Sequence, residues 1–113
     1  MTERAKKYLS DILQAIALVE SFTTSINNFF DYQADLKTKS AVERQLSIIG
    51  EAVNKFKKEA QEIELSHTRQ MVNFRNRLIH AYDNIDDTIV WTVIKKHLPT
   101  LKIEIEKALT TNQ

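Results

Sequence analysis

Apolar side chains recur at helical spacing along most of the chain. Near the N-terminus they alternate steps of four and three residues, with Leu13 widening the face: Ala5, Leu9, Ile12, Ile16 and Val19. The same alternation returns further on: Val42, Leu46, Ile49, Val53 and Phe56. This spacing gathers apolar residues on one side of a helix, as in the seam of a helical bundle. It predicts two long amphipathic helices, whose seams fit either a partner subunit or another helix of the same chain.

Shorter elements are expected around these two helices. A helix over residues 25–32 would turn Ile26, Phe29 and Phe30 inward, and residues 31–40 read as a polar connection. Thr38 or Ser40 could cap the second long helix, because their hydroxyls accept hydrogen bonds from free backbone N–H groups.

The second half of the chain continues the helical pattern. Ser66 could cap a helix that ends near His80, with three apolar residues inward: Met71, Phe74 and Leu78. Asp86 or Asp87 could cap the next helix, and Pro99 suits the first turn of a last helix. The sequence therefore predicts an all-α protein, an up-down antiparallel bundle of about five or six helices. The length favours a single domain over residues 1–113.

Composition removes several classes of protein. The 113 residues include one glycine, one proline and no cysteine, which argues against a hairpin-rich fold and excludes disulfides and thiolate metal sites. The absence of cysteine fits a reducing cytosol, and no apolar run is long enough to span a membrane, so a cytoplasmic location without membrane contact is expected. Gly50 falls inside a predicted helix. The usual reason for a glycine at such a position is the close approach of another helix.

Positive charge is concentrated in one stretch, although the formal net charge is only +1. Residues 66–82 carry Arg69, Arg75 and Arg77 and no acidic residue. A local positive patch is therefore expected there.

Arg75 and His80 suit the cleavage of RNA. Arginine stays charged and matches phosphate geometry, while histidine titrates near neutrality and can take or give a proton. A base could remove the proton of a ribose 2′-hydroxyl, whose oxygen then attacks the adjacent phosphorus while a cation stabilises the developing charge. This scheme requires no metal or cofactor. Asn76 lies one helical turn before His80 and could orient its imidazole.

Helix geometry sets a condition on this pair. Five residues turn a continuous helix by about 500°, which leaves Arg75 and His80 about 140° apart around the axis. Either the helix ends before His80, or a second copy of the segment completes the site. A simpler interpretation also stands: both cations near a helix C-terminus are favoured there by the helix dipole alone.

Three stretches together resemble a known family. The first is residues 41–52, which contain Ile49-Gly50-Glu51-Ala52. The second is residues 75–82, where four residues separate the arginine from the histidine and one separates the histidine from Tyr82. The third is a C-terminal pattern of Ile85-Asp86, Val90-Trp91, Ile94 and Leu98-Pro99. In this order they are similar to the HepT-like group of HEPN-domain toxins, the toxins of HEPN/MNT type VII toxin–antitoxin pairs.

The resemblance implies a dimeric helical bundle whose active cleft lies between two protomers. Arg75 would bind the scissile phosphate, His80 would act as general base or acid, and Asn76 would support them. Tyr82 matches the tyrosine that a minimal nucleotidyltransferase (MNT) antitoxin modifies by transferring AMP. The chain departs from the family at Asn73-Phe74, where Gly-Met is common, and in lacking an upstream tryptophan, which puts substrate preference in doubt.

Two classes of function therefore compete. The first is a toxin that acts as a metal-independent endoribonuclease on cellular RNA, with tRNA among the candidate targets, and that AMPylation of Tyr82 neutralises. The alternative is a non-catalytic nucleotide- or substrate-binding subunit of a nucleotidyltransferase complex, and a structural helical adaptor is a third option.

Overall fold

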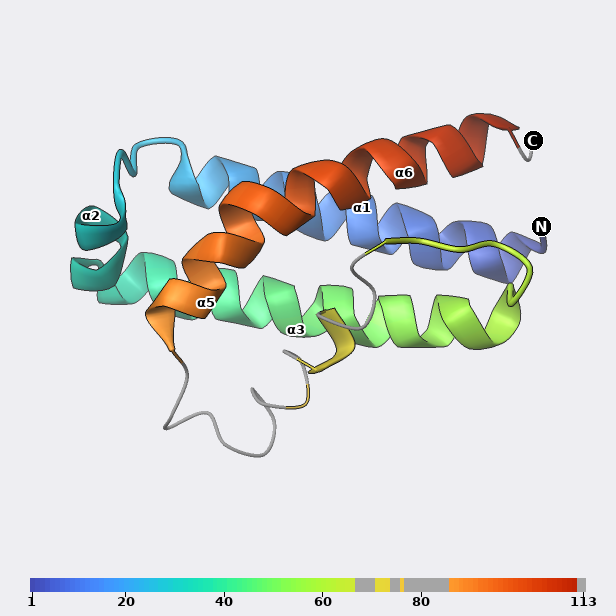
Figure 1. The fold of residues 1–113 in the computed structure, drawn as a ribbon, viewed down its shortest axis with the longest axis horizontal. Coiled ribbons are helices and arrows are strands. Elements are labelled where there is room, and N and C mark those ends of the chain that lie inside the picture. The colour runs from blue at the N-terminus through green and yellow to red at the C-terminus, as the bar shows by residue number, and fades with distance from the viewer. Residues whose placement is uncertain (67–70, 74–75, 77–85, 112–113) are drawn as a thin grey trace.

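Two long antiparallel helices form the frame of the molecule. The computed structural model describes residues 1–66, 71–73, 76 and 86–111, and none of these lies in a strand. Helix α1 spans Glu3–Thr23 and helix α3 spans Leu36–Glu59, and they run side by side in opposite directions (Figure 1). The all-α prediction is confirmed.

The two apolar seams are filled inside the chain. Every seam residue of α1 is at most 1% exposed, and every seam residue of α3 is 0% exposed. Both sets belong to one core cluster, which helix α6 (Leu98–Thr111) joins with three buried residues: Leu98, Leu101 and Ile105. Of the two partners that the spacing allowed, the seams therefore use a helix of the same chain.

Helix α2 differs from the expected element. It spans Phe29–Ala34, because the Asn28 side chain accepts a hydrogen bond from the Asp31 backbone N–H at 2.9 Å and so fixes the start. Beginning there, the helix turns Tyr32 into the core and leaves Phe30 75% exposed. The prediction that Phe30 faces inward was wrong, while Ile26 is buried in the loop before the helix.

The connection between α2 and α3 is much shorter than predicted. Helix α3 begins at Leu36, and its cap is Asp35, not Thr38 or Ser40. The Asp35 carboxylate accepts from the Thr38 backbone N–H at 3.0 Å and from its hydroxyl at 2.7 Å. These hydrogen bonds lower the pKa of Asp35, because they favour the charged form.

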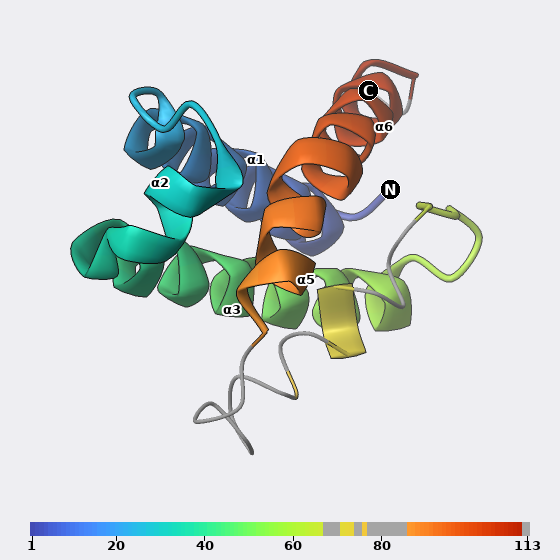
Figure 2. The ribbon, with the colours of Figure 1, turned by 60° about the vertical axis from the view of Figure 1, so that its left-hand side comes forward.

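Residues 87–111 form one continuous bent helix (Figure 2). Helix α5 (Asp87–Thr92) starts after its cap Asp86, as expected, and passes into a π-helical turn, η2 (Val93–His97), and then into α6. The Leu98 N–H donates to the carbonyl of Val93, five residues back. The wider turn stands directly before Pro99, whose ring would clash with the carbonyl of Lys95 in a regular α-helix.

None of the helices described for this chain has the length and apolar character needed to span a bilayer. Gly50 is buried in α3, and by helical spacing it lies on the same flank as Lys39 and Glu43. At the start of this flank, Lys39 contacts Asp87 of α5.

Truncating the α1–α3 seam should strongly destabilise the fold. Leu46 is 0% exposed, so Leu46→Ala is expected to lower the free energy of unfolding by about 2–5 kcal/mol. Leu36→Ala is the matched control, because Leu36 is 72% exposed on the same helix. Urea denaturation measures both; equal losses in the two variants would contradict the assigned core.

Candidate active site

Of the residues predicted for the site, the structure describes Asn76, which is helical and exposed. Arg75, His80 and Tyr82 lie outside the described residues. The structure therefore describes the two flanks of the candidate segment, the stretches through which the chain enters and leaves residues 75–82.

The first flank is tied to α6. The backbone N–H of Ser66 donates to Oε2 of Glu104 at 2.7 Å, a contact between residues 38 positions apart. Met71 is 0% exposed in the core, and the partly buried side chain of Val72 packs against that core. Met71 was expected to face inward, and this is confirmed. These contacts fix the chain where it approaches the candidate segment.

The second flank is tied to α3. The Asp86 side chain accepts from the Thr88 backbone N–H at 2.9 Å and caps α5. The next residue, Asp87, forms an ion pair with Lys39, with 2.7 Å between Oδ2 and Nζ. The Lys39 and Asp87 side chains are only 19% and 15% exposed, so the pair is largely shielded from water.

A buried tyrosine lies beside this ion pair. Tyr32 is 0% exposed, and no described residue supplies a hydrogen-bond partner for its hydroxyl. Burial raises the pKa of the Tyr32 phenol well above its usual range, and the carboxylates of Glu43 and Asp87 raise it further, so the phenol is neutral at physiological pH. Its ring centroid lies 5.5 Å from that of Trp91 on α5.

Glu43 completes this cluster. Burial raises the pKa of its carboxyl, the nearby charge of Asp87 raises it further, and Lys39 opposes both. One ammonium group thus serves two carboxylates. We name Tyr32, Lys39, Glu43 and Asp87 the α3–α5 anchor. Periodicity gave no sign of it, because its members come from three helices and pair across long sequence distances.

A separate groove of about 400 Å³ lies between α1 and α3. Its charged lining residues are Asp11, Glu51 and Lys55, and its apolar rim includes Leu18 and Ile48. Two carboxylates against one ammonium make it a poor seat for an RNA backbone. In the part of the chain that the structure describes, no three or more histidine, aspartate or glutamate side chains gather as metal ligands would.

The raised pKa of Glu43 gives a pH-dependent stability. Below the ordinary value of 4.5 the carboxyl is protonated in both the folded and unfolded chain, and the folded state loses stability as the pH rises through the raised value. Glu43→Gln should therefore raise the melting temperature at about pH 7 and leave it nearly unchanged at about pH 4. Glu106→Gln, on an exposed position of α6, is the control. A melting temperature of Glu43→Gln no higher than the unaltered protein's at neutral pH would refute this.

Comparison with known proteins finds one family and several relatives. The family Ribonuclease HepT-like matches residues 12–108. "Probable ribonuclease HepT" of Thermococcus cleftensis is 43% identical over 111 residues, which cover 95% of this chain and 97% of that protein. "Putative RNase MJ1380" of Methanocaldococcus jannaschii is 36% identical, over 89% of this chain and 93% of that protein.

A third relative is aligned over a similar share of both chains. "Putative RNase TTE0752" of Caldanaerobacter subterraneus is 32% identical, over 92% of this chain and 93% of its own length. No solved structure matches the chain significantly. The family match takes in α3, the candidate segment and α5, and most of α1 and α6. The chain therefore belongs to the HepT-like ribonuclease family.

Proposed function

We propose that this protein is a metal-independent endoribonuclease, the toxin of a toxin–antitoxin pair, which acts on cellular RNA in the cytoplasm. The observation that carries the proposal is the intact series Arg75, His80 and Tyr82 inside a family match that spans residues 12–108. The names of three relatives, each aligned over about nine tenths or more of its length, support ribonuclease chemistry. tRNA is one candidate substrate.

The chemistry needs only side chains of the candidate segment. His80 as a base removes the proton of a ribose 2′-hydroxyl, and that oxygen attacks the neighbouring phosphorus. The bond from phosphorus to the 5′-oxygen of the next nucleotide breaks, and the imidazolium form of His80 gives its proton to that oxygen. Arg75 stabilises the extra negative charge on the phosphate in the transition state. Asn76, exposed on its helix, supports the orientation of His80.

The site is proposed to be shared between two protomers. If residues 75–80 formed a continuous helix, Arg75 and His80 would be about 140° apart around its axis, and a second copy could supply the missing group. The apolar seams do not support a dimer, because α1 and α3 fill them within the chain. The homodimer therefore rests on the angular argument and on the family.

Tyr82 is proposed as the point of control. A cognate MNT-type nucleotidyltransferase would transfer AMP from ATP to its hydroxyl and release pyrophosphate. The new phosphodiester adds negative charge and bulk within two residues of His80, in a segment of positive charge suited to phosphate. RNA would then be repelled electrostatically and blocked sterically.

Loss of either catalytic side chain should abolish cleavage. Purified protein is expected to cut RNA in the presence of EDTA, and Arg75→Ala and His80→Ala to reduce the rate by about 100-fold or more. Arg77→Ala, inside the segment, and His67→Ala, before it, are matched controls, since each removes a side chain of the same type as a proposed catalytic residue. Full activity in both single variants would exclude this site, and protein that binds a nucleotidyltransferase but cuts no RNA would favour the non-catalytic alternative.

AMP transfer should be confined to the peptide that contains Tyr82. After incubation with the antitoxin and ATP, mass spectrometry is expected to show an adenylyl adduct on that peptide and a parallel loss of RNA cleavage. The Tyr82→Phe variant should remain unmodified and uninhibited, and the peptide containing Tyr8 serves as an internal control. An adduct elsewhere, or inhibition without an adduct, would count against this mode of control.

A further inference from the structure

We propose that the Lys39–Asp87 ion pair positions the candidate cleavage segment by fixing to α3 the point at which the chain leaves that segment. The inference rests on the proposed function, because it assigns Lys39 and Asp87 a role in the same reaction. Neither residue touches the RNA in this proposal; both act through the chain that connects them to His80 and Tyr82.

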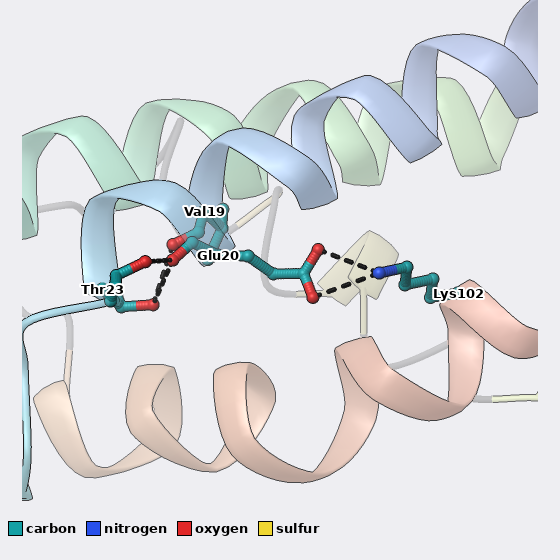
Figure 3. A network of polar contacts seen from close by, with 5 residues as sticks. Val19, Glu20, Thr23 and Lys102 are labelled. Atoms are coloured by element: carbon teal, nitrogen blue, oxygen red, sulfur yellow. Dashed lines mark hydrogen bonds and ion pairs between the residues drawn. The ribbon is translucent and has the colours of Figure 1, made fainter.

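This pair differs from the other described ion pairs in burial. Its side chains are 19% and 15% exposed, whereas those of Lys102 and Glu20, which join α6 to α1, are 41% and 54% exposed (Figure 3). In each described pair within one helix, at least one of the two side chains is more than 50% exposed. Lys39 and Asp87 are therefore the described pair with least access to water.

The low exposure of the Lys39 and Asp87 side chains is poorly explained by stability alone. Removing two charges from water carries a desolvation penalty that their attraction only partly offsets, so an apolar pair of similar size is often at least as stable. A pair that is largely shielded from water does fix geometry, since either charge left there without the other is unfavourable. The Glu43 carboxylate lies beside the pair, where Lys39 attracts it and Asp87 repels it.

The anchor sets both the place and the direction of α5. Asp87 is the first residue of that helix and is bound to α3, while Trp91, one turn further on, stacks obliquely on Tyr32 of α2. Two contacts about one turn apart restrain translation and tilt together. The start of α5 therefore has a defined position relative to α2 and α3.

A fixed start of α5 restricts where the candidate residues can lie. Tyr82 is five residues and His80 seven residues before Asp87. An extended chain reaches at most about 3.6 Å per residue, so their Cα atoms stay within about 18 Å and about 25 Å of that of Asp87. Releasing Asp87 from Lys39 would widen the region open to both side chains, and catalysis is sensitive to displacements of about 1 Å.

The experiment compares Asp87→Asn and Lys39→Met with two controls, Glu20→Gln and Lys102→Met, which break a long-range pair away from the segment. Cleavage is measured at saturating RNA and at a temperature where thermal unfolding shows every variant to be folded. We expect the anchor variants to lower kcat by about 10- to 100-fold with little change in KM, and the controls to keep the unaltered rate. The double variant Lys39→Asp with Asp87→Lys should recover part of the loss.

Hydrogen exchange of peptides that cover residues 77–85 gives a readout that does not depend on cleavage. Exchange should be faster in the two anchor variants than in the unaltered protein and the controls. A normal kcat in Asp87→Asn, with or without lower thermal stability, would overturn the positioning role. If the unaltered protein cuts no RNA, the proposed ribonuclease fails, and the exchange data alone decide whether the pair positions the segment: unchanged exchange would overturn that role.

Discussion

Burial of the seam between α1 and α3 is the interaction on which the other elements depend. Ten seam residues, each at most 1% exposed, join two antiparallel helices along their length. Two described ion pairs that place later helices start from these two helices. Lys39 of α3 holds α5, and Glu20 of α1 holds α6 through Lys102 (Figure 3). Without the seam, neither helix would present these groups at fixed positions.

This frame supports the candidate segment from both sides. Glu104 on α6 binds the backbone at Ser66, and Lys39 on α3 binds Asp87, so the chain between them starts and ends at defined points. The arrangement agrees with a general feature of functional sites, in which reactive residues lie on a segment that a rigid scaffold holds in place. The proposed role of the partly buried anchor comes at some expense of stability, because burial and the charge of Asp87 disfavour the ionised carboxylate of Glu43 and raise its pKa.

Periodicity predicted the long helices well, because burial on one helix face leaves a direct pattern in the sequence. Periodicity did not predict the helix boundaries between Phe29 and Ser40, because several residues there could cap a helix. The caps in the structure are Asn28 and Asp35. Periodicity could not find the α3–α5 anchor, since Lys39 and Asp87 lie 48 positions apart and each looks like an ordinary surface charge. Arg75 and His80 were predicted as site residues from their chemistry and from the resemblance, and they lie outside the described residues.

The end groups of the RNA product test the proposed chemistry most directly. Attack by the 2′-oxygen leaves a 2′,3′-cyclic phosphate on one fragment and a 5′-hydroxyl on the other, and a 2′-deoxy substitution at the cleaved position removes the nucleophile. The account predicts these ends in the presence of EDTA, together with resistance of the deoxy-substituted RNA. Fragments with a 3′-hydroxyl and a 5′-phosphate, or cleavage of the deoxy-substituted RNA, would contradict it.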